Sequence, residues 1–222
     1  MKRAPPWLLP VACAVLPAIA AHVAWWISRE AGHIPDCIPH LEGCTSISRA
    51  ARHGTANLVF KALMLPAAAL QAINWAMAAR WIEIRAGSHG AARGLLPLGV
   101  VAGIALAVYA AFLGTEGAVY GWLRRYGITF YFAATFCAML VFVRGLRRFA
   151  EPKHKAGVLM GLCLGMLALG LANVLAPLFG SDEVLRERLR DAMEWQLGAL
   201  FCAWFLVQAW SMRRIDPMTA LR

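Results

Sequence analysis

Two cysteines and two histidines alternate along the longest hydrophilic segment of the chain, residues 28–57, in the order His33, Cys37, His40 and Cys44. Cysteine and histidine are the usual zinc ligands, but this spacing matches no common zinc pattern. We therefore expect neither a metal nor a cofactor. If the segment lies on the oxidising side of a membrane, Cys37 and Cys44 are expected to form a disulfide, and free thiols are the alternative.

Two serines that follow the second cysteine could supply the nucleophile of a hydrolase. They are Ser46 and Ser48, with His40 or His53 as the base and Asp36 as its partner. A nucleophilic serine needs a base within hydrogen-bonding distance and an oxyanion site, and the chain has no Gly-x-Ser-x-Gly elbow. The alternative is that these serines cap a helix. The pattern assigns no catalytic residue.

Six further polar residues lie near the ends of the long apolar segments that are expected to face the outer side of the membrane. Charged groups at membrane depth are costly, face the interior of a helix bundle and tend to pair. We expect Lys61 to pair with Glu116 or Glu194, with His22 as a neighbour that changes charge near neutral pH. Such a cluster suits a lipid headgroup, and snorkelling with structural pairing is the alternative. The six residues are His22, Lys61, Glu116, Tyr120, Asn173 and Glu194.

Helices that cross a bilayer are expected to position these residues, because the charged residues of the chain are bunched. Of the 222 residues, 60% are hydrophobic and 15% are charged, against about 25% charged in a soluble domain. Roughly 20 apolar residues span a hydrocarbon core, and six charge-free segments of about that length are present. We therefore predict an all-α integral membrane protein, one domain of residues 1–222, with six spans near 7–27, 58–81, 94–114, 127–143, 156–179 and 192–212.

The positive charges predict the orientation of these helices. The net charge is +10, and with the N-terminus inside, the inner segments carry this whole surplus. Lysine and arginine accumulate in cytoplasmic loops, so both termini are predicted to be cytoplasmic. The surplus suits anionic membrane lipids as partners and not nucleic acid. The first residues resemble a cleavable signal peptide, but the apolar run continues to Ile27, so a retained helix is expected. Cleavage would leave five spans.

Glycine recurs every fourth residue in the fifth predicted span, at Gly157, Gly161 and Gly165. Small residues at this spacing let helices approach closely in lipid. We expect this face to pack inside one bundle, and a homo-oligomer interface is the alternative.

Two other polar patterns are given a structural interpretation. Gln71 and Asn74 lie one turn apart in the second span and are expected to form interhelical hydrogen bonds rather than a conduction path. Residues 182–191 alternate acidic and basic side chains. They are interpreted as a short amphipathic turn of helix with a solvated face.

Two short segments resemble a known family. The stretch Cys44-Thr45-Ser46-Ile47-Ser48 is similar to the Pro-Ser-Ile-Ser-type stretch of the FRAG/DRAM/SFK membrane family, with Thr45 in place of the proline. Glu194-Trp195 resembles the Glu-Trp that begins the last helix of that family. The resemblance implies lipid handling, as in autophagy modulators, fungal proteins of plasma-membrane lipid organisation and the N-terminal module of GPI-anchor lipid-remodelling proteins. It implies no catalytic residues.

These observations lead to three functional hypotheses. The first is a protein that binds or organises membrane lipid through a polar cluster facing the outer leaflet. The second is a lipid-modifying enzyme, an acyl hydrolase or transferase. A transporter ranks last because it needs polar groups through the full membrane depth. The Ala- and Arg-rich composition and the compact loops are typical of a bacterial inner-membrane protein.

Overall fold

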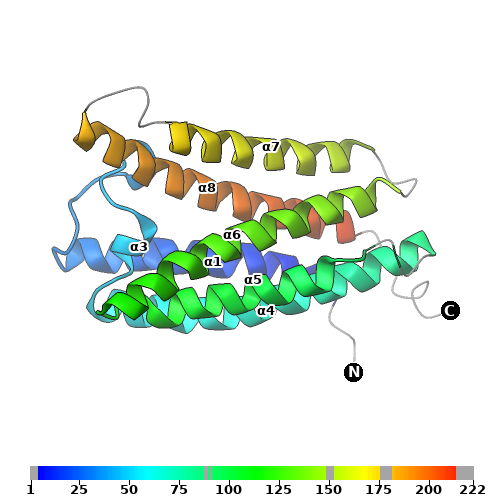
Figure 1. The fold of residues 1–222 in the computed structure, drawn as a ribbon, viewed down its shortest axis with the longest axis horizontal. Coiled ribbons are helices and arrows are strands. Elements are labelled where there is room, and N and C mark those ends of the chain that lie inside the picture. Colours follow the sequence, from blue (N-terminus) through cyan, green and yellow to red (C-terminus); the bar gives the residue numbers. More distant parts are fainter. Residues whose placement is uncertain (1–4, 88–89, 91, 149–152, 176–181, 214–222) are drawn as a thin grey trace.

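The computed structural model describes residues 5–87, 90, 92–148, 153–175 and 182–213, which form helices and their connections and contain no strand. Six long helices of this part run side by side, and two short helices lie in the connection between the first two long ones (Figure 1). In chain order the elements are α1 (Leu8–Glu30), α2 (Pro39–Glu42), α3 (Ile47–Ala50), α4 (Gly54–Ala86), α5 (Leu95–Phe112), α6 (Ala118–Leu146), α7 (Lys153–Leu175) and α8 (Glu183–Met212).

Five of the long helices are long and apolar enough to cross a membrane: α1, α4, α5, α6 and α7. The all-α class and the multipass membrane character are therefore confirmed. The sixth predicted span falls in α8, which has 30 residues but is not one of the five. Its first third is rich in charge, and Gln196 and Gln208 interrupt the apolar remainder. Both termini and residues 176–179 of the fifth predicted span lie outside the described residues.

Helix α6 begins at Ala118, well before the predicted start near residue 127. The predicted start followed from Arg124 and Arg125, which precede the charge-free segment. In the structure, Arg124 donates from its guanidinium to the carbonyl oxygens of Phe112, at 3.2 Å, and of Thr115. The charged side chain thus satisfies the carbonyl groups where α5 ends, and the helix accommodates it.

Helix α8 begins at Glu183 rather than near residue 192. Asp182 caps it, because its carboxylate accepts hydrogen bonds from the backbone N–H groups of Val184 (3.0 Å) and Leu185 (3.2 Å). The interpretation of residues 182–191 as a separate short turn is therefore wrong. This segment is the first part of one continuous helix.

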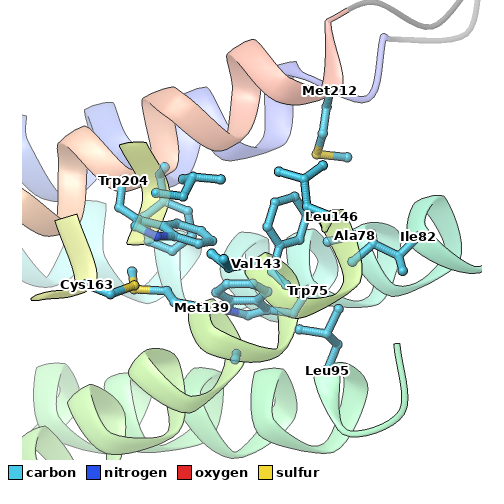
Figure 2. Packing of buried hydrophobic residues seen from close by; sticks show 14 of the residues in the cluster. Trp75, Ala78, Ile82, Leu95, Met139, Val143, Leu146, Cys163, Trp204 and Met212 are labelled. Atoms are coloured by element: carbon cyan, nitrogen blue, oxygen red, sulfur yellow. The ribbon is translucent and has the colours of Figure 1, made fainter. Parts of the chain in front are cut away.

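Buried aromatic side chains from α4, α6 and α8 fill the core of the bundle. The ring centroids of Trp75 and Trp204 lie 5.7 Å apart, and those of Phe142 and Trp204 lie 5.6 Å apart (Figure 2). Gly99 of α5 is required beside them, since a Cβ atom there would lie 2.3 Å from the Trp75 Cβ. Close packing of this kind holds helices together in lipid, where the solvent is as apolar as the side chains.

Polar side chains in the middle of the bundle pair with one another. The Gln71 amide donates to the Thr135 hydroxyl at 3.3 Å, joining α4 to α6. The Asn74 amide donates to the Gln208 carbonyl at 3.1 Å, joining α4 to α8. All four residues are buried. The predicted interhelical hydrogen bonds of Gln71 and Asn74 are thus confirmed.

Helix α7 packs mainly on α8 and lies at the edge of the bundle (Figure 1). A Cβ atom added at Gly157 or Gly161 would meet nothing within 4 Å, and one at Gly165 would meet only Leu200, at 3.7 Å. The expectation that this face packs inside the bundle is therefore wrong for Gly157 and Gly161. The homo-oligomer interface through this face stays a prediction.

Candidate functional site

The connection between α1 and α4 folds over one end of the bundle. Cys37 and Cys44 form the predicted disulfide, with their Cα atoms 6.5 Å apart, and the residues between them contain α2. We call residues 37–44 the disulfide loop. The buried Ser28 hydroxyl donates to the Ala50 carbonyl at 2.6 Å and ties the end of α1 to α3. The connection is therefore a fixed structure and not a solvated linker.

The disulfide predicts a pattern of cysteine labelling. A membrane-impermeant maleimide added to the outside of intact cells should label Cys37 and Cys44 only after reduction, because the thiols are engaged and the loop is external under the predicted orientation. The modification is read by mass spectrometry of the purified chain. Cys137, which is exposed on a transmembrane helix, is the internal control and should stay unlabelled because it faces lipid. Labelling of Cys37 without reductant would contradict the disulfide.

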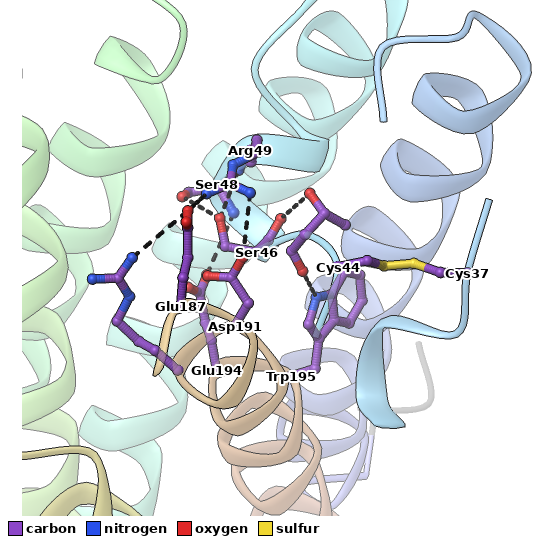
Figure 3. A network of polar contacts seen from close by, with 11 residues as sticks. Cys37, Cys44, Ser46, Ser48, Arg49, Glu187, Asp191, Glu194 and Trp195 are labelled. Carbon is purple, nitrogen blue, oxygen red and sulfur yellow. Dashed lines mark hydrogen bonds and ion pairs between the residues drawn. A yellow bond between two sulfur atoms is a disulfide. The ribbon is translucent and has the colours of Figure 1, made fainter. Parts of the chain in front are cut away.

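Helix α3 is attached to the first two turns of α8 by an arginine that contacts two carboxylates. The Arg49 guanidinium lies 2.5 Å from a Glu187 oxygen and 3.4 Å from an Asp191 oxygen (Figure 3). Ser46 caps α3, since its hydroxyl accepts the backbone N–H of Arg49 at 3.1 Å. The cap and the ion pairs together fix the orientation of α3 on α8.

Two segments that are far apart in the sequence, Thr45–Ser48 and Glu194–Trp195, contact each other. The Trp195 indole N–H donates to the Thr45 carbonyl at 2.8 Å, and the Ser48 backbone N–H donates to the Glu194 carboxylate at 3.4 Å (Figure 3). The two residues joined by the 2.8 Å bond are 150 positions apart in the sequence. We call this arrangement of Thr45–Arg49 with Glu187, Asp191, Glu194 and Trp195 the α3–α8 network.

Two histidine rings pack on the same tryptophan. The centroids of His22 and His40 lie 5.3 Å apart in a stacked arrangement, and those of His40 and Trp195 lie 5.0 Å apart. The Gln196 amide also donates to the His40 carbonyl at 3.2 Å. These contacts hold the disulfide loop against α1 and α8.

This histidine pair predicts a pH dependence of stability. Burial, and then the charge of His22, lower the pKa of His40 below the usual value of 6.5. A histidine with a lowered pKa binds fewer protons in the folded state than in the unfolded state, so stability falls as the pH falls below about 6.5. The melting temperature in detergent should therefore drop between pH 7.5 and pH 5.5. The variant His40→Gln should show a smaller drop, and an unchanged drop would contradict this assignment.

The polar residues predicted to form one cluster occupy several places. Glu194 belongs to the α3–α8 network. His22 contacts that network because its ring packs against Trp195. Lys61 is half-buried on α4, and among the ion pairs between described residues there is none from Lys61 to Glu116 or Glu194. The others are exposed: Glu116 lies in the connection between α5 and α6, Tyr120 in the first turn of α6 and Asn173 near the end of α7.

The serines are not placed for nucleophilic catalysis. The Ser46 hydroxyl is 3.1 Å from the Ser48 hydroxyl and also accepts the helix-capping bond. In the part of the chain that the structure describes, no hydrogen bond joins either serine to a histidine. The ring of His53 lies against that of His33, with centroids 5.4 Å apart. Ser46 therefore has the capping role that was the alternative interpretation.

Three residues of the network carry roles that the sequence did not suggest. Arg49 was not singled out, and Glu187 and Asp191 were assigned to a solvated face. That interpretation is wrong for Asp191, which is only 3% exposed. A signal was present, since acidic residues at 183, 187 and 191 follow a spacing of four, which places them on one face of a helix.

No family model, curated protein or solved structure matches this chain. The site must therefore be interpreted from its own geometry. That geometry joins a capped turn of helix, a set of ion pairs between α3 and α8, and a disulfide at one end of the bundle. Among the described residues, no three histidine, cysteine or carboxylate side chains gather as a metal site would need.

Proposed function

We propose that the chain crosses the membrane six times, with both termini in the cytoplasm. Helix α8 supplies the sixth span, because its 30 residues lie along α1 and α7. Cation–π contacts between arginine and tryptophan at helix ends support this arrangement, because tryptophan favours the membrane–water interface. The Arg29 guanidinium lies 4.7 Å from the Trp26 ring centroid at the outer end of α1, and that of Arg85 lies 5.6 Å from the Trp81 centroid at the inner end of α4.

The function that this arrangement supports best is the binding of membrane lipid at the outer end of the bundle, through the α3–α8 network. The contact between the two segments that resemble the FRAG/DRAM/SFK family carries the proposal. It brings Glu194 and Ser48 together from distant parts of the chain, and under the proposed topology they lie at the level where α8 enters the bilayer. Charged groups at such a depth mark functional sites in membrane proteins. A relationship to that family and a bacterial inner-membrane location belong to the same proposal.

The charge of the network suits a headgroup more than an acyl chain. Arg49, Glu187 and Asp191 present both signs of charge within one ion-paired group. A zwitterionic or anionic headgroup can exchange partners with such a group without leaving a charge unpaired.

Removal of lipid tests this proposal. The purified protein should melt at a lower temperature after exhaustive delipidation in detergent, and added phospholipid should restore the original value, because a ligand that binds only the folded state stabilises it. Melting is followed by tryptophan fluorescence. An unchanged melting temperature after complete delipidation would lead us to abandon lipid binding as the function.

A further inference from the structure

A cavity of about 360 Å³ lies between the disulfide loop and the first turns of α8. Its size falls within the range of small-molecule sites. Gly43 and the disulfide line it from the loop, and Val184, Glu187, Arg188 and Asp191 line it from α8. The charged side chains that line it are Asp36, Glu42, Glu187, Asp191, Arg49 and Arg188.

Carboxylates outnumber guanidinium groups in the lining of this cavity, and one buried carboxylate oxygen has no hydrogen-bond donor. Arg49 contacts both Glu187 and Asp191. Arg190 lies 4.0 Å from Glu187, and Arg29 lies 3.4 Å from Asp36. Asp191 is 3% exposed, yet its Oδ2 atom accepts no hydrogen bond and Arg49 approaches it only to 3.4 Å. A buried carboxylate oxygen without a donor is costly. A ligand that donates hydrogen bonds to this oxygen would remove that cost.

The lining selects the kind of cation. In the described part of the chain, no three histidine, cysteine or carboxylate side chains gather as a metal ion would need, which favours an organic cation with N–H donors. The cavity also has no aromatic side chain in its lining, and aromatic rings are what recognise a quaternary ammonium group. A primary ammonium group, which donates three hydrogen bonds, fits carboxylate walls of this kind.

Apolar side chains are exposed on the disulfide loop and at the start of α8, as a position at the membrane surface requires. On the disulfide loop, Ile38 is 56% exposed and Leu41 is 77% exposed, and Val184 on the α8 wall is also exposed. Arg188 lines the cavity and forms no ion pair with another described residue. We propose that the cavity binds the primary ammonium group of a phospholipid headgroup, with Asp191 and Glu187 as acceptors and Arg188 against the phosphate.

This inference rests on the proposed lipid-binding function and names the headgroup that the site takes. The full chain in detergent is titrated with short-chain phosphatidylethanolamine, with phosphatidylcholine and phosphatidylglycerol of the same chain length, and with free ethanolamine. Binding is read from tryptophan fluorescence. The Kd for phosphatidylethanolamine should be about tenfold lower than for phosphatidylcholine, since charge-assisted hydrogen bonds are lost with the N–H donors. Free ethanolamine should bind more weakly than the phospholipid.

Variants locate the effect. Asp191→Asn should abolish the preference, and Glu187→Gln should reduce it and serves as the second test if Asp191→Asn folds poorly. Glu183→Gln, on the same helix but outside the lining, should keep it. Equal affinity for the three phospholipids, or an unchanged preference in Asp191→Asn and Glu187→Gln, would overturn this inference and leave lipid binding intact. Equal affinity for free ethanolamine would overturn the lipid as the source of the ammonium group. Binding of no phospholipid would contradict the proposed function itself.

Discussion

Replacement of Trp195 by alanine is expected to lower the free energy of unfolding by about 3–5 kcal/mol, the range for a buried aromatic residue. The side chain is 2% exposed and joins three parts of the chain. Its ring packs on His22 and His40, and its indole N–H donates to the Thr45 carbonyl. The substitution removes this packing and leaves the carbonyl unpaired. Unfolding in detergent, followed by circular dichroism, measures the loss.

Two matched variants separate the contributions. Trp195→Phe keeps an aromatic ring but removes the indole N–H, so it should cost about 1–3 kcal/mol, the cost of a buried group without its partner. Trp210→Ala removes a tryptophan of the same helix that is 45% exposed and should cost less than Trp195→Ala. Equal losses for Trp195→Ala and Trp210→Ala would show that the α3–α8 network does not depend on Trp195.

The second large effect is expected at Gly43, in the disulfide loop. This residue has φ of +59°, and a Cβ atom there would lie 1.7 Å from the Arg188 carbonyl oxygen of α8. Gly43→Ala therefore combines a left-handed backbone conformation, which costs roughly 1–2 kcal/mol for residues other than glycine, with a contact that forces the loop away from α8. We expect a loss of about 3 kcal/mol or more, toward the large end for single substitutions. Thermal unfolding measures it.

Gly32 offers the control for this substitution. It also lies in the connection between α1 and α4 with a positive φ, of +71°, but a Cβ atom there would meet nothing within 4 Å. Gly32→Ala should therefore show the backbone cost alone. If the two variants lose the same stability, the close approach of the loop to α8 is not present in solution, and the cavity beside it would be lost as well.

Much of the fold was predictable, because hydrophobicity and charge act locally along the chain. The bilayer requires long apolar helices, so the segments around residues 58–81 and 94–114 were placed close to their observed positions. The starts of α6 and α8 were predicted too late in the sequence. Charged residues can lie within a helix when the arginine binds free carbonyl groups or when an acidic residue caps the helix. Arg124 and Asp182 do this here.

The candidate site was only partly predictable, because it depends on contacts between distant residues. The disulfide followed from two cysteines in one loop. The partner of Glu194 did not, since opposite charge alone suggested Lys61, whereas the structure gives it the backbone N–H of Ser48. Asp191 shows the same limit. Nothing local distinguishes it from the exposed Glu183, and only the position of α3 on α8 makes it buried.

Native mass spectrometry of the gently extracted protein tests the central claim most directly. Wild type is compared with Glu194→Gln, which changes the α3–α8 network, and with Lys61→Met, which changes a polar residue that forms no ion pair with Glu194. We predict that wild type and Lys61→Met retain a defined phospholipid and that Glu194→Gln loses it. Retention of the same lipids by all three proteins, or of none by wild type, would contradict lipid binding at the α3–α8 network.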